Sequence, residues 1–220
     1  MGRQAALSLF FVILLASESA WCGETGGAGR LHRVPPAKLS LIVPAGSHLM
    51  AEPRAIEGFL SALDGQPPDW NAVYGQGHHE SGLDDRLFAL NRERDVRREG
   101  HPELSWLVSF LWVGEVTEYD EKRGGFPVAL GSRFIKTRWG LIRFKPEEAP
   151  GNLLMTTDAV QQELFQRKLV QGETVEIDVV MTGRLVPEES LLYDFSHDEA
   201  GIGVIMPFIR VEQVDFVLAQ

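Results

Sequence analysis

The pattern of apolar and polar positions divides the chain into a helical part and a later strand-rich part. In the stretch "EPRAIEGFLSALDG", apolar residues recur every three to four positions, as on one face of an α-helix (Ile56, Phe59, Leu60 and Leu63). Pro53 suits the first turn of this helix, and Gly65 suits its end. A second helix is indicated between Ser81, which begins a capping-box-like sequence, and Gly100. We therefore expect a helical segment at residues 53–103.

From Leu104 onwards the pattern becomes that of β-strands. The stretches "LSWLVSFLWVGEVTEYD", "FPVALGSRFI" and "RWGLIRFKP" are rich in β-branched and aromatic residues. "TDAVQQELFQRKLVQG" follows as a helix, which Thr157 or Asp158 caps and Gly172 ends. "ETVEIDVVMTGRLV" alternates apolar and polar residues, and "GIGVIMPFIRVEQVDFVLA" supplies the last strand. Residues 104–220 are thus interpreted as three strands, a helix and two strands.

This order of elements resembles the OB-fold, a five-stranded barrel that carries a helix between its third and fourth strands. Gly114, inside the long first strand, fits the sharp bend that small barrels make there. The predicted fold class is α+β and mainly β, with a small OB-like five-stranded barrel preceded by the helical segment. An eight-stranded barrel or another α+β sheet would give a similar pattern.

The first twenty residues have the layout of a secretory signal peptide. "MGRQAALSLFFVILLASESA" contains an early cation at Arg3, an apolar run at residues 9–16, and then small residues. This run is about half the ~20 residues that a membrane-spanning helix needs, and no later segment is long and apolar enough. We expect residues 1–20 to be removed on export to the periplasm or outside the cell, in a bacterial envelope, with no transmembrane span.

Residues 21–52 follow as an expected flexible leader, since they are rich in glycine from residue 23 onwards and contain three prolines. Cys22, the single cysteine, cannot form an internal disulfide. A lipid anchor at Cys22 is disfavoured because the bulky Trp21 precedes it.

Charge is distributed unevenly along the chain, which carries a net charge of −10. Residues 147–220 hold fourteen acids and four cations, whereas residues 122–145 hold seven cations and no acid. The cations of residues 122–145 alternate with aromatic residues, a combination that binds extended anionic ligands in barrels of the OB type. We therefore take this expected hairpin as the candidate ligand surface, and its candidate residues are Arg133, Lys136, Arg138, Trp139 and Arg143.

An alternative explanation is that these cations pair with the acids that follow, which would neutralise the patch and leave the aromatics as core. The arginines of "NRERDVRREG" are expected to pair with acids of their own helix on a solvated face. Nucleic acid is disfavoured as a ligand, since the chain is acidic and exported.

The densest group of potential metal ligands lies in "GQGHHESGLDD", where His78, His79 and Glu80 are consecutive. A zinc site needs three or four ligands that converge, and two adjacent histidines point apart in regular structure. A polar loop and helix start therefore explain the stretch better than a metal site. No phosphate-binding loop, nucleophile elbow or zinc-protease motif is present.

The sequence favours an exported, non-catalytic binding or assembly module without a cofactor. Its partner would be an anionic ligand, a glycan or another protein. The alternative is an envelope hydrolase or metal-dependent enzyme that uses His78, His79 and Glu80. A structural subunit whose acidic half docks onto a basic partner is a third possibility.

Overall fold

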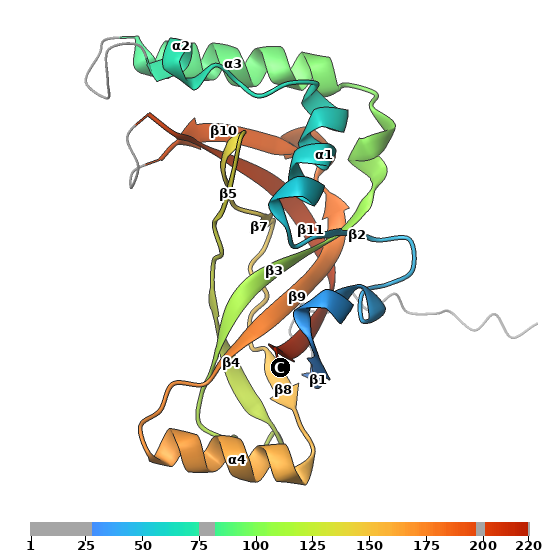
Figure 1. Cartoon of the computed structure of the whole chain (residues 1–220), viewed down its shortest axis with the longest axis vertical. Coiled ribbons are helices and arrows are strands. Elements are labelled where there is room, and N and C mark those ends of the chain that lie inside the picture. Colours follow the sequence, from blue (N-terminus) through green and yellow to red (C-terminus); the bar gives the residue numbers. More distant parts are fainter. Residues whose placement is uncertain (1–27, 75–81, 197–200, 220) are drawn as a thin grey trace, which may run out of the picture.

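A computed structural model describes residues 28–74, 82–196 and 201–219, and these form a mixed α+β fold (Figure 1). The described residues contain four α-helices: α1 (Pro53–Asp64), α2 (Trp70–Tyr74), α3 (Leu83–Arg98) and α4 (Ala159–Val170). They contain eleven strands: β1 (Ala28–Val34), β2 (His48–Met50), β3 (Leu107–Val116), β4 (Phe126–Gly131), β5 (Ile135–Thr137), β6 (Gly140–Ile142), β7 (Lys145–Pro146), β8 (Leu154–Thr156), β9 (Glu176–Leu185), β10 (Leu191–Phe195) and β11 (Gly203–Ala219). Short 3-10 helices are η1 (Pro36–Leu41), η2 (Pro102–Ser105) and η3 (Pro187–Glu189).

Six strands pair in a path that returns to its start. The order is β1-β8-β4-β3-β9-β11, and β11 then pairs with β1. The pairings of β1 with β8 and with β11 are parallel, and the other four are antiparallel. The predicted mixed α+β class is confirmed, but the prediction of five strands is wrong, because the sheet has eleven. One physical reason is β1, which lies in the stretch expected to be a flexible leader and pairs with both β8 and β11.

The residues expected to form a flexible leader contribute to the sheet from residue 28 onwards. β1 pairs with β8 and β11, and β2 runs parallel to β3. Leu39 of η1 packs with residues of three strands in a small apolar cluster on one side of the sheet (Leu111, Val180 and Val217). Apolar contacts thus hold this stretch in place despite its prolines and glycines. The expected signal peptide and Cys22 lie outside the described residues.

The first residues of β11, 203–207, belong to a second group of strands. β10 and β6 flank them, and β5 forms a hairpin with β6, so the local order is β10-β11-β6-β5. Figure 1 shows α1, α2 and α3 at this end of the molecule and α4 at the opposite end, below β4 and β8. Long strands β3, β9 and β11 connect the two ends.

The larger of the two apolar clusters in the described residues joins the helices to the sheet. The four apolar residues predicted to share one face of the first helix are all buried in α1, which confirms that prediction (Ile56, Phe59, Leu60 and Leu63). They belong to the same cluster as buried residues of β3, β9 and β11. The helix predicted at residues 157–172 is α4, which Asp158 caps by accepting a hydrogen bond from the Gln161 backbone N–H at 2.8 Å. None of the helices in the described part of the chain is long and apolar enough to cross a membrane.

Candidate functional site

The cation-rich segment 122–145 does not form one continuous hairpin. Its first strand, β4, pairs with β3 and β8, whereas β5 and β6 join the strands beside β11. Figure 1 shows β4 in the lower part of the molecule and β5 in the upper part. The cations of this segment are therefore distributed over two regions.

Two of the five candidate residues are matched to carboxylates. The Arg133 guanidinium lies 2.6 Å from Asp178 of β9. The Arg138 guanidinium lies 2.9 Å from Glu57 of α1, whose carboxylate also accepts the Arg138 backbone N–H. Only Asp178 belongs to the acidic segment 147–220. These pairs favour the alternative explanation for Arg133 and Arg138, in which such cations are neutralised internally.

Trp139 and Lys136 occupy contrasting positions. Trp139 is 0% exposed and belongs to the main core, so its ring offers no face to a ligand. Its carbonyl accepts a hydrogen bond from the Trp70 indole N–H at 2.7 Å, which ties α2 to the β5–β6 hairpin. Lys136 is exposed on β5. The structure therefore separates Trp139 from the binding surface to which the sequence assigned it.

Arg143, the fifth candidate, is held by aromatic rings instead of carboxylates. Its guanidinium carbon lies 5.6 Å from the centre of the Phe134 ring and 6.0 Å from that of Trp112. Its side chain makes no hydrogen bond or ion pair with the residues that the structure describes, and its buried Nε has no acceptor. Stacking of this kind orients a guanidinium while its charge stays available to an anion.

A small cleft of about 130 Å³ opens beside Arg143. Val204 of β11 pairs with Leu141 of β6 on one side and with Asp194 of β10 on the other, so the three residues are side by side. These three residues line the cleft together with Met206, Phe134 and Phe195. The Phe134 side chain is 47% exposed, which is high for a ring of its size. The cleft thus combines an apolar floor, one cation and one acid.

The contribution of β10 to this cleft could not be found from the sequence. Asp194 and Phe195 stand about fifty residues after Arg143 in an acidic stretch, and they meet it only because β10 and β6 both flank β11. Phe134 had a signal, as an aromatic residue between cations. Trp112, in the first strand-rich stretch, had no such signal.

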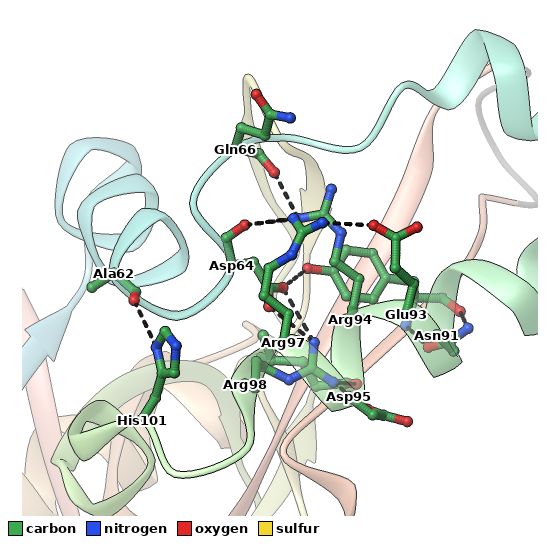
Figure 2. A network of polar contacts seen from close by, with 12 residues as sticks. Ala62, Asp64, Gln66, Asn91, Glu93, Arg94, Asp95, Arg97, Arg98 and His101 are labelled. Atoms are coloured by element: carbon green, nitrogen blue, oxygen red, sulfur yellow. Dashed lines mark hydrogen bonds and ion pairs between the residues drawn. The ribbon is translucent and has the colours of Figure 1, made fainter.

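A buried polar network lies at the same end of the molecule, where α1, α3 and β10 meet (Figure 2). The Asp64 carboxylate accepts hydrogen bonds from Arg98 at 3.2 Å and from the Tyr193 hydroxyl. Arg94 donates to the carbonyls of Asp64 and Gln66, and Arg98 also donates to the Leu191 carbonyl. The expected solvated face of α3 is therefore wrong for Arg94 and Arg98, which are buried. The network joins three elements, which gives it a structural role, although the buried Nε atoms of Arg94 and Arg98 have no acceptor among the described residues.

Tyr193 is predicted to make stability sensitive to alkaline pH. Burial raises the pKa of its hydroxyl well above 10, and the Asp64 carboxylate raises the pKa further. In the unfolded chain a tyrosine ionises near pH ~10, so above that pH only the unfolded chain releases this proton. The stabilising contribution is therefore complete below pH ~10 and falls by up to about 1.4 kcal/mol per pH unit above it.

Urea unfolding between pH 9 and 11.5, with Tyr193→Phe as the comparison, measures this effect. We expect the variant to be less stable at neutral pH but to lose less stability as the pH rises. Parallel curves for the two proteins would contradict a buried, protonated Tyr193.

The three residues of the metal hypothesis, His78, His79 and Glu80, lie outside the described residues. Within residues 28–74, 82–196 and 201–219, no group of three or more His, Cys, Asp or Glu side chains is arranged to hold a metal ion. Comparison of the chain with protein-family models, curated proteins and solved structures gave no match. The local chemistry of the clefts is thus the evidence on which a function can be argued.

Proposed function

We propose that the protein is an exported, non-catalytic binding module, built on an OB-like ring of strands, whose ligand site is the cleft beside Arg143. The observation that carries the proposal is the state of this arginine. Its guanidinium is oriented by two rings but makes no ion pair or hydrogen bond with any described side chain or carbonyl. The other two candidate arginines are paired with carboxylates. The signal-peptide pattern of residues 1–20 supports the exported part of the proposal.

The ligand that fits this cleft best carries a carboxylate next to an apolar group. A guanidinium binds carboxylates through paired hydrogen bonds, which gives directional as well as electrostatic attraction. Leu141, Val204 and Met206 would receive the apolar group. The cleft is smaller than the ~300–1,000 Å³ typical of drug-sized ligands, so it suits one terminal group of a peptide. Asp194, at its edge, can accept an N–H of the same ligand.

Methyl NMR with two matched small molecules tests this proposal. N-acetyl-leucine has the carboxylate, and N-acetyl-leucinamide has the same apolar side chain without the charge. We expect the acid to shift the methyl signals of Leu141, Val204 and Met206, and the amide to do so much more weakly. Arg143→Met should reduce the affinity for the acid at least about tenfold, since hydrogen bonds to charged groups contribute about 1.5–3 kcal/mol.

Arg138→Met is the matched control, because Arg138 lies in the same segment but pairs with Glu57. It should leave the affinity for N-acetyl-leucine unchanged. Equal shifts with the acid and the amide, or full binding by Arg143→Met, would refute a carboxylate site at this cleft.

A further inference from the structure

We propose a second binding site, for a phosphate-type oxyanion, at the first turn of α4. A cavity of about 210 Å³ lies there. Figure 1 shows α4 at the opposite end of the molecule from β10, which lines the Arg143 cleft. The cavity is lined by Arg30, Leu31 and Arg33 of β1 and by Thr157, Asp158 and Gln161 at the start of α4. The pairing of β1 with β8 produces this arrangement, since Arg30 stands opposite Thr156, just before the helix begins.

The start of α4 is electrostatically suited to an anion. A helix N-terminus carries a partial positive charge of about half a unit and presents backbone N–H groups that have no intrahelical acceptor. Arg30 adds a guanidinium that makes no hydrogen bond or ion pair with the described residues. Arg33 adds another, which donates to the Gln161 side-chain oxygen and lies 3.8 Å from the Asp158 carboxylate. Two cations and the helix terminus therefore meet at one cavity.

An orphaned donor points independently to a ligand at this cavity. Gln161 lines the cavity although the residue is only 2% exposed, and its side-chain Nε2 has no acceptor among the described residues. The Gln161 oxygen already accepts from Arg33, so the amide orientation is fixed with its N–H₂ group unused. Buried polar groups nearly always have a partner, and an oxygen of a bound anion would supply one.

One residue at the cavity opposes an anion, and this makes the proposal sharply testable. The Asp158 carboxylate caps the helix by accepting the Gln161 backbone N–H. Its negative charge would repel a bound phosphate. Asparagine caps helices as well as aspartate does, so Asp158→Asn removes the charge and keeps the cap. We expect this variant to bind phosphate about fivefold more tightly, as removal of one close charge repulsion in a solvated site implies.

The experiment titrates inorganic phosphate into the wild type and its variants, with sodium chloride matching the ionic strength, and follows the amide NMR signals of Thr157, Asp158 and Gln161. Arg30→Met should weaken phosphate binding at least about tenfold and leave the melting temperature without phosphate unchanged, because Arg30 has no described partner. Arg167→Met, at the other end of α4, is the control and should bind phosphate like the wild type.

A second arm separates the two sources of such a group. Vesicles of phosphatidylcholine with and without phosphatidic acid are tested for co-sedimentation of the wild type and Arg30→Met. Arg30-dependent binding to inorganic phosphate alone identifies a free phosphate, and Arg30-dependent binding to phosphatidic acid vesicles identifies a lipid headgroup. The proposal would be overturned if neither inorganic phosphate nor phosphatidic acid vesicles bind in an Arg30-dependent way. It would also be overturned if Asp158→Asn binds phosphate no better than the wild type.

Discussion

Replacing Arg98 by methionine is expected to lower the free energy of unfolding by about 3–5 kcal/mol, as measured by urea denaturation at neutral pH. The methionine keeps much of the apolar stem but removes the charge that faces Asp64. Asp64 and Arg98 are 0% and 1% exposed, so water cannot replace the lost partner. A buried carboxylate without its cation is among the most destabilising features that a single substitution produces.

The arrangement around Arg98 explains why the effect should be this large. Its guanidinium donates to the Asp64 carboxylate, to Asp95 of the same helix and to the Leu191 carbonyl of β10. Removing it leaves acceptors on three elements without their donor. The Tyr193 hydroxyl still donates to Asp64, but a neutral hydrogen bond does not neutralise the charge. The loss should therefore spread from α1 through α3 to β10 (Figure 2).

Arg97→Met is the matched control, one residue earlier on the same helix. Arg97 is exposed, pairs with Glu93 and reaches only the Asp64 backbone carbonyl, at 3.2 Å. Surface pairs of this kind contribute about 0–1 kcal/mol. A double variant, Asp64→Leu with Arg98→Met, should recover part of the stability, because the buried Asp64 carboxylate is then no longer left without its cation. Equal losses for Arg97→Met and Arg98→Met would show that Asp64 is not balanced by Arg98.

The network also shows why the helical region could be predicted only in part. Apolar spacing was sufficient for α1, because the four buried residues of its face repeat along the sequence. In α3 the buried positions include two arginines, and their partners are remote. Asp64 precedes Arg98 by 34 residues and Tyr193 follows Asp64 by 129. Acids of the same helix stand close enough in the sequence to pair with these arginines, so the sequence pattern indicated a solvated helix face.

The strand-rich region was predictable in the place of its helix but not in the number or pairing of its strands. Strands do precede and follow the predicted helix, and α4 lies between β8 and β9, but six strands (β3 to β8) precede it instead of three, and β10 was not predicted. β1 was missed because "AGRLHRV" places two arginines and a histidine among few apolar residues. Its place in the sheet depends on its parallel pairings with β8 and β11. The alternation of apolar and polar residues within a segment carries no information about such pairings.

The candidate ligand residues illustrate the same limit. The sequence showed a run of cations at residues 122–145, but it could not indicate which of them have partners. Arg138 meets Glu57 across 81 positions, and Arg133 meets Asp178 across 45. Arg143 differs because the groups nearest its guanidinium are rings. Long-range pairing, which is decided by the fold, thus leaves Arg143 without a carboxylate partner among the described residues.

Replacing Gly183 by alanine is expected to cost at least about 3 kcal/mol of unfolding free energy, again by urea denaturation. Gly183 lies in β9 opposite Val211, next to the register shift between Val211 and Gln213 of β11. A Cβ atom there would lie 2.8 Å from the Arg210 carbonyl carbon and closer still to its oxygen. Ordinary contacts between such atoms are about 3.4 Å or longer, and these atoms belong to backbone that cannot rotate away. Relief requires β9 and β11 to separate.

Gly58→Ala is the control for the steric clash between an added Cβ atom and the neighbouring backbone. Gly58 lies inside α1, where an added Cβ meets nothing within 4 Å. Alanine is the better helix former, so this variant should gain about 0.5–1 kcal/mol. The change from glycine to alanine should therefore lower the free energy of unfolding at Gly183 and raise it at Gly58.

The strands β9 and β11 are neighbours in the closed path of strand pairings. Separating them breaks this path at one of its six pairings. A Gly183→Ala variant as stable as the wild type would mean that β9 and β11 do not approach this closely, and that the closed path of pairings is wrong at this junction.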